Sequence, residues 1–474
     1  MVAPPNPPGL TAYERDCLDR LYEVWSTKLG RNQLKKKYYR AKNSLKDLGI
    51  SLPPKLKNME TALGWPAKAV DMLAARSKFD GFVYSGEVDG IDGILRANNF
   101  NLLYNQAVTS ELVHSCSFVT VSMGGGYGEP PIIVSAYSAE TAAGIWDSRR
   151  KRLECGMTVV EVDDKTKMPT WINLYTDEAV IEMHKEGAGW VAQRLVHAQG
   201  RPLMEALVYK PELDRPMGKS RITRTVMSIT DSAVRTALRT ELSAEYYTSP
   251  QRYFLGVDES LFKDKDKWEF YVGSIAALTR DENGDVPQVG QFPQMSMQPH
   301  TDYMRSLAAL FAGETNIPVN ALGIIHDNPS SAEAIRAAEN YLIIDAQDLN
   351  DTNGHALRNI GLLIHAVKNG TTVDRLSEEE ASLTVKWRNP SLPSVVSQAD
   401  AIMKHVTAIP WLAETEVALE ELGYDESQRS RLLSDKKRIM AQAALEQARQ
   451  QVMMMQMQAA QEQEGDDANK QGTA

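Results

Sequence analysis

The sequence predicts an α+β protein that is built from several modules, and three features carry this prediction. The chain has 474 residues, which is too many for a single hydrophobic core. Short segments rich in β-branched residues, which predict strands, lie between about residues 117 and 210. After residue 218 the spacing of apolar residues predicts mainly helices. Strands and helices that are segregated along a chain in this way are typical of α+β architectures.

Apolar residues recur at helical spacing from the start of the chain to about Ile50, which predicts a helix. This segment includes a basic run from Arg31 to Lys46. A second helix is predicted over Gly64 to Phe82, with Pro66 in its first turn, and a third from Asn98 to about Ser115. The strands expected next are SFVTVSM (117–123), PIIVSAYSAE (131–140), TVVEV, TWINLY, EAVIEMH, GWVAQRLV and EALVYK, the last ending at Lys210.

The second half begins with a helix predicted over residues 219–247, followed by a turn-rich segment and a helix over about residues 301–314. A loop with two prolines precedes Ser330 and Glu333, which form a capping box for a long helix that ends at Asn369-Gly370. Two glycines inside this helix favour a kink. A strand is expected at residues 382–390, then helices, then a disordered polar tail from about Glu464.

The helix over residues 219–247 has two chemically different faces. At about 100° per residue, four arginines fall within a stripe roughly 60° wide, and small apolar residues lie nearly opposite. The arginines are Arg221, Arg224, Arg235 and Arg239. The spacing does not decide whether this stripe faces DNA, solvent or the carboxylates of another subunit.

No catalytic, cofactor or metal site is recognisable, so we expect a protein that is not an enzyme. Gly218-Lys219-Ser220 lacks the preceding glycine of a phosphate loop, because Leu213 occupies that position, and a helix start explains it better. The three cysteines form no CxxC pair. The net charge of −10 argues against a surface that grips nucleic acid throughout. Neither a signal peptide nor a membrane span is expected.

Three segments resemble the portal proteins of siphophages, a family of tailed double-stranded DNA bacteriophages. They are WPAKAVDMLAARSKFDGF, GKSRITRTVMSITDSAVRTALRTELSAEYYTSPQRYFLG and VGQFPQMSMQPHTDYMRSLAALFAGETNIPVNALG. The resemblance covers about residues 65–390. It lies in the order of the segments and in their amino-acid sequences, not in a catalytic signature.

The resemblance implies a multi-domain portal fold with a wing, two stem helices, a small β-containing clip and a helical crown. By position, residues 1–218 and 332–392 correspond to the wing, 219–247 and 300–316 to the stem helices, and 248–299 to the clip. Residues 317–331 correspond to the tunnel loop and 393–474 to the crown and tail.

The implied function is a ring at one capsid vertex, usually of twelve copies, through which double-stranded DNA is packaged and ejected. Implied partners are the terminase, connector or adaptor proteins, and the major capsid and scaffolding proteins, with assembly in the host cytoplasm and a place in the virion.

The loop residues expected to face the channel are Ile324, Ile325, His326, Asp327 and Asn328. A loop buried between subunits is the alternative. The run from Arg31 to Lys46 could likewise contact DNA, a neighbouring subunit or solvent.

Two other functions remain open. A minor capsid or head-tail adaptor protein would be monomeric until assembly, so the oligomeric state distinguishes it from a portal. A packaging enzyme such as a large terminase requires a phosphate loop and clustered nuclease carboxylates, and we recognise neither.

Overall fold

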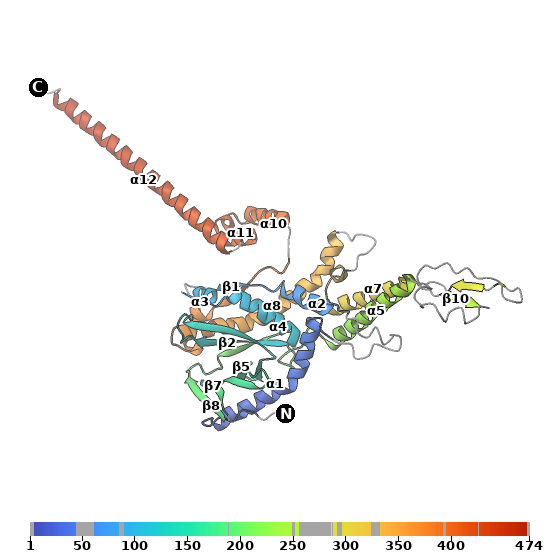
Figure 1. Ribbon diagram of the computed structural model, residues 1–474. Coiled ribbons are helices and arrows are strands. Elements are labelled where there is room, and N and C mark those ends of the chain that lie inside the picture. Colours follow the sequence, from blue (N-terminus) through green and yellow to red (C-terminus); the bar gives the residue numbers. More distant parts are fainter. Residues whose placement is uncertain are drawn as a thin grey trace. The chain divides into compact units, whose positions relative to one another are not determined.

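The structure is a computed structural model, and it describes residues 4–43, 61–84, 90–187, 189–248, 252–255, 286, 288–291, 296–323, 332–391, 395–424 and 426–471. The chain divides into two compact units, Met1–Pro390 and Ser391–Ala474. Helices and antiparallel strands both occur in the first unit (Figure 1), which confirms the α+β class.

The first helix, α1 (Ala12–Tyr39), packs on a five-stranded antiparallel sheet. Thr11 and Glu14 form a capping box at its start, which satisfies two backbone N–H groups that would otherwise lack partners. Its apolar face, including Leu18 and Leu21, is buried against Met157 and Ile172 of the sheet. The sheet has the order β4-β5-β6-β7-β8, formed by Ala142–Asp147, Arg152–Val162, Pro169–Tyr175, Ala179–Glu186 and Gly189–Val196.

A second and larger core surrounds a three-stranded sheet of order β3-β2-β9, formed by Ile132–Ser138, Cys116–Met123 and Met204–Val208. Every residue of β2 up to Val121 is buried, as expected for the central strand of a covered sheet. The helices that contribute to the same core include α2 (Trp65–Ala74), α3 (Ile91–Ala97), α4 (Phe100–His114) and α8 (Ala332–Lys368) (Figure 1).

The predicted second helix is only partly correct. It ends at Ala74, and Phe79–Val83 forms a strand, β1, that pairs antiparallel with β12 (Thr384–Trp387). Phe79 and Phe82 are buried beside the long helix α8. A local helical pattern could not predict this pairing, because its partner strand lies about 300 residues away in the sequence.

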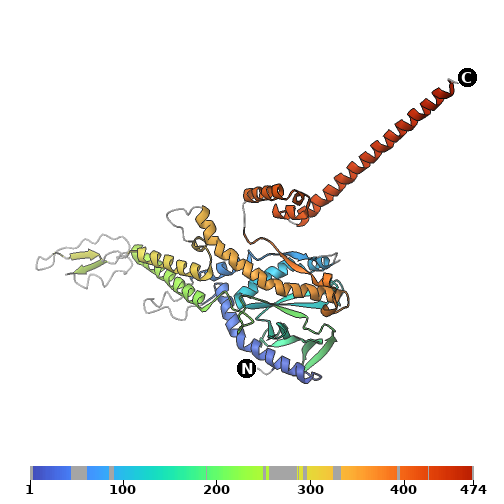
Figure 2. The same ribbon diagram turned by 180° about the vertical axis from the view of Figure 1, so that it is seen from behind.

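Two long helices, α5 (Arg224–Thr248) and α7 (Gln298–Thr315), lie side by side in opposite directions (Figures 1 and 2). Hydrogen bonds at both ends show this orientation. Thr223, just before α5, donates to Glu314 near the end of α7 at 3.0 Å, and Ser243 contacts His300 near its start at 3.1 Å. Between them in sequence, β10 (Arg252–Leu255) pairs with β11 (Gln288–Gln291), within the segment predicted as the clip.

The helix α8 confirms the predicted long helix up to Lys368, while its predicted capping box at residues 330–333 falls partly outside the described residues. Short elements follow it before β12: η4 (Val373–Arg375) and α9 (Glu378–Ala381).

The second unit contains α10 (Val395–Ala408), η5 (Pro410–Glu414), α11 (Glu416–Glu421) and α12 (Glu426–Gln471). The expected disordered tail from Glu464 is wrong as far as Gln471, because α12 continues to that residue. Its last turns are rich in Gln, Glu and Ala, which have high helix propensity.

Candidate functional site at the base of the paired helices

The paired helices α5 and α7 bury one face against each other and leave another apolar face uncovered. Val226 and Leu238 of α5 and Phe311 of α7 are almost completely buried. On α7, however, Tyr303 and Leu310 are 51% and 61% exposed. These two residues are seven apart, so they lie on the same side of the helix, about two turns from each other.

The predicted basic stripe is reduced to three arginines of α5. Arg224 and Arg239 are exposed, and Arg235 is half-buried. Arg221 does not join them, because α5 begins only at Arg224 and the Arg221 side chain is buried. The periodicity argument assumed that the helix started at Lys219, and this assumption was wrong.

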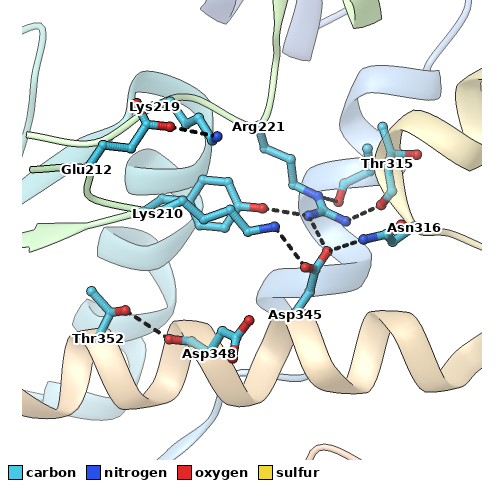
Figure 3. A network of polar contacts seen from close by, with 11 residues as sticks. Lys210, Glu212, Lys219, Arg221, Thr315, Asn316, Asp345, Asp348 and Thr352 are labelled. Carbon is cyan, nitrogen blue, oxygen red and sulfur yellow. Dashed lines mark hydrogen bonds and ion pairs between the residues drawn. The ribbon is translucent and has the colours of Figure 1, made fainter. Parts of the chain in front are cut away.

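The buried Arg221 guanidinium connects four separate segments at the base of the paired helices (Figure 3). Its Nε donates to the backbone oxygen of Ala69 in α2 at 2.8 Å, and Nη2 donates to that of Thr315 at the end of α7. Its Nη1 donates to the Tyr209 hydroxyl at 2.9 Å and to the Asp345 carboxylate of α8 at 3.2 Å. One side chain thus fixes the start of α5 and the end of α7 against α8.

Asp345 is the anionic centre of this cluster. Its carboxylate also accepts from Lys210 Nζ at 2.8 Å and from Asn316 Nδ2 at 3.1 Å. Burial alone would raise its pKa, but the Lys210 hydrogen bond and the charge of Arg221 outweigh burial and hold the pKa below its usual value. Asp345 therefore stays ionised and paired, which is the condition under which a buried ion pair is stable.

The Gly218-Lys219-Ser220 sequence has a structural role. Gly218 has a φ of +64°, and a Cβ there would lie 2.2 Å from the Tyr209 carbonyl oxygen, so only glycine fits. Lys219 forms an ion pair with Glu212 at 2.9 Å (Figure 3), and the buried Ser220 hydroxyl donates to the Val113 carbonyl oxygen at 2.5 Å. Gly218, Lys219 and Ser220 are therefore all engaged in local packing or bonding, and they do not bind a phosphate in the way a phosphate loop does.

The five loop residues predicted to face a channel, Ile324, Ile325, His326, Asp327 and Asn328, lie outside the described residues. The segments that flank this loop are described. Before it, η3 (Val319–Leu322) ends at Gly323, and after it α8 begins at Ala332.

Over the described ranges of the chain, the structure places no group of three or more His, Cys, Asp or Glu side chains where they could hold a metal ion. Cys17, Cys116 and Cys155 are buried and free. No described helix is both long enough and apolar enough to cross a bilayer.

Comparison with known proteins decides the family. The model of the family described as "Phage portal protein, SPP1 Gp6-like" matches residues 18–423, which include both paired helices and the whole Arg221 cluster. The chain belongs to this portal protein family. Members of the family are structural components of the phage particle and not enzymes, as the sequence predicted.

Two curated portal proteins are similar to this portal chain over most of their length. The portal protein of Mycobacterium phage L5 is 26% identical over 412 residues, which are 83% of this chain and 82% of that protein. The portal protein of Mycobacterium phage D29 is 27% identical over 413 residues, with 83% of each chain covered.

Solved structures similar to this portal chain come from gene transfer agent (GTA) particles. A chain of the native GTA virion is 11% identical, with a TM-score of 0.43, and the match covers 73% of this chain and 86% of that one. A chain from the neck of the empty GTA particle is 13% identical, with a TM-score of 0.44 and coverages of 80% and 89%. Since both TM-scores are below 0.5, the family assignment rests on sequence.

The Arg221–Asp345 cluster of the portal chain was not predicted from sequence. One signal was present: Asp345 stands among Leu342, Ala346 and Leu349, all of which are buried on one face of α8. A lone carboxylate on an apolar helical face requires a buried cationic partner. Its partner Arg221 is more than 120 residues away, and no local spacing identifies it.

Proposed function

We propose that this portal protein forms a closed ring at one capsid vertex and that double-stranded DNA passes through its central channel during packaging and ejection. Membership of the portal family supports this function. The observation that carries ring formation is the exposed apolar face of α7 at Tyr303 and Leu310, which a single chain leaves in water. A copy of the same chain that covers this face with a different face of its own produces a closed ring if the rotation closes.

The proposed assembly has twelve copies and is built in the host cytoplasm. Its proposed partners are the terminase during packaging, connector or adaptor proteins afterwards, and the major capsid and scaffolding proteins of the shell.

The proposed roles of the segments follow the order of the chain. Residues 1–218 and 332–392 form the wing, residues 219–247 and 300–316 the two stem helices, residues 248–299 the clip, 317–331 the tunnel loop, and 393–474 the crown and tail. The tight attachment of α5 and α7 to α8 by Arg221 supports a stem that is anchored to the wing.

Native mass spectrometry and electron microscopy of the purified full-length chain test the ring. We expect closed rings with a central channel, and we expect Leu310→Lys to dissociate them, because the charge would have to be buried between subunits. Tyr127→Lys is the control, since Tyr127 is fully exposed on a loop and its replacement should leave rings intact. A chain that stays monomeric at all concentrations and salt conditions would instead fit an adaptor protein.

The arginines of α5 have two proposed partners, DNA in the channel or carboxylates of the adjacent subunit. In the described part of the chain, neither Arg235 nor Arg239 forms an ion pair. Replacing both by Gln separates the alternatives. Intact rings that package DNA at an altered rate identify DNA as the partner, whereas loss of rings identifies a subunit contact.

The loop from Ile324 to Asn328 is proposed to line the constriction of the channel. It mixes apolar and polar residues without a basic cluster, so it would touch DNA without gripping its phosphates. Deleting these five residues should leave rings intact and impair DNA packaging or retention. Normal packaging and retention of full-length DNA by the shortened protein would contradict a gating role.

A further inference from the structure

A cavity of about 880 Å³ lies between α1 and the segment that leads into α5, and neither Arg221 nor Asp345 lines it. One wall is the second half of α1, and the other is the segment from Asp214 to Met227. Trp146, at the end of β4, and His114, at the end of α4, also line it. Every lining residue belongs to the described part of the chain.

Six cationic side chains and a single carboxylate, that of Asp214, line this cavity. Three of the cations follow each other on one face of α1, at positions i, i+3 and i+7. The six are Lys28, Arg31 and Lys35 of α1 and Arg215, Lys219 and Arg224 of the opposite wall.

Most of these cations lack an anionic partner. Lys219 is paired with Glu212, and Lys35 Nζ donates to the carbonyl oxygen of His114 at 3.1 Å. The other four form no ion pair with any residue that the structure describes: Lys28, Arg31, Arg215 and Arg224.

The positive charges are close enough to affect one another. The pKa of Lys35 is lowered to about 8, mainly by burial, and the charges of Arg31, Arg215 and Lys28 contribute to this lowering. A bound anion would remove this mutual repulsion, so the cavity favours an acidic ligand.

The cavity also has an apolar floor, which a site for a bare anion does not need. Leu34 is 45% exposed beside the basic face of α1, although it is a large apolar side chain. Further apolar lining residues include Trp146, Met217, Ile222 and Met227. A ligand that matches this surface carries both acidic groups and a large apolar group.

We propose that this cavity is a docking site for an acidic peptide segment of a partner protein, with a large apolar side chain seated against Leu34 and Trp146. Arginine side chains recognise carboxylates with paired N–H donors, which suits Arg31, Arg215 and Arg224. A volume of about 880 Å³ accommodates a few side chains, whereas a DNA duplex is too wide to enter it. All lining residues of the cavity come from one chain, so peptide binding can be measured whether or not the chain forms a ring.

Selection of peptides from a random 12-residue display library on the full-length protein tests the proposal. We expect enrichment of sequences that combine Asp or Glu with Leu, Phe or Trp. A fluorescently labelled selected peptide should bind at least tenfold more weakly to Arg31→Glu and to Arg215→Glu, both of which replace exposed side chains. Lys37→Glu is the matched control, because Lys37 is an exposed cation of the same helix that does not line the cavity.

Two further measurements separate the apolar part of the site from its charge and exclude other ligands. Leu34→Ser should abolish the preference for apolar residues and leave the preference for acidic ones. The proposal is overturned by no acidic enrichment or by equal binding to the Arg31 and Lys37 variants. It is also overturned if double-stranded DNA or inorganic phosphate displaces the selected peptide at comparable concentration. Equally tight binding of a peptide of residues 376–383 (LSEEEASL) would assign the cavity to a second copy and not to a partner protein.

Discussion

Arg221 is suited to its position because four hydrogen-bond acceptors surround it on different sides. Only a side chain with several N–H donors in fixed directions can reach all of them. The guanidinium supplies five N–H donors in one plane, and here they reach two backbone oxygens, a hydroxyl and a carboxylate. A lysine has three donors on one nitrogen and cannot reach acceptors on opposite sides. The site therefore requires arginine.

Replacing Asp345 by Asn should destabilise the first unit by about 3–5 kcal/mol, because it leaves the Arg221 charge buried without its counter-ion. Chemical denaturation monitored by circular dichroism measures this loss. The exposed pair Lys219–Glu212 provides the control, since Glu212→Gln should cost no more than about 1 kcal/mol. Equal losses for the two variants would show that the Arg221–Asp345 pair does not hold the helices in place.

Glu111 is another buried carboxyl group in contact with α8. It accepts a hydrogen bond from Asn353 Nδ2 at 2.8 Å, and burial raises its pKa to about 8. Because this pKa is higher in the folded than in the unfolded chain, the folded protein binds more protons between about pH 4.5 and 8. Stability therefore falls as the pH rises through this range.

Glu111→Gln should remove this pH dependence. At pH 5, where the carboxyl group is protonated in the folded state, the variant should be about as stable as the wild type. At pH 9 the variant should be more stable, by an amount on the order of 3 to 5 kcal/mol if the full shift is realised. Thermal unfolding at both pH values measures the difference. A wild-type advantage at pH 9 would mean that the Glu111 carboxylate is stabilised when ionised.

At the level of elements, α8 is a central helix of the larger of the two cores in the first unit. It contacts β2, β9 and β12 as well as α2 and α3. Gly361 allows part of this packing, because a Cβ at this position would lie 2.8 Å from Leu383 and 2.9 Å from Phe82. A kink is therefore not needed to explain this glycine.

Gly361→Ala should destabilise the protein by about 1–3 kcal/mol through overpacking between α8 and the β1–β12 strand pair. Gly354 in the same helix is the matched control, since the nearest atom to its Cβ position is 3.7 Å away. Gly354→Ala should be neutral or stabilising by up to about 1 kcal/mol, because alanine has the higher helix propensity. Comparable losses in the two variants would indicate a backbone effect in place of side-chain overlap.

Elements with a local signal were predictable from the sequence, and elements that depend on distant partners were not. The strands β2, β3 and β5 to β9 and the helices α5, α7 and α8 were expected near their observed positions, because their periodicity or β-branched composition is local. The strand β1 was mistaken for helix, since its partner β12 lies far along the chain. For the same reason, neither the burial of Arg221 against Asp345 nor the cavity between α1 and the segment before α5 was foreseen.

At the level of the whole molecule, both hydrophobic cores are made entirely from the first unit, by residues between Leu10 and Trp387. A chain that ends at Pro390 should therefore fold on its own. We expect its thermal midpoint to match the main transition of the full-length protein, measured by calorimetry. A truncated chain that is unfolded or aggregated at low temperature would show that residues 391–474 are needed for folding.

The pairing of β1 with β12 has a consequence for the order of synthesis. About 300 residues separate Phe79 from Trp387, and ribosomes require roughly 15 to 60 s to translate that distance in bacteria. Throughout this interval Phe79 and Phe82 have no partner strand, and the edge of β1 is open to pairing with other chains. The first unit is thus completed late in translation, and this interval is when host chaperones have most access to the nascent chain.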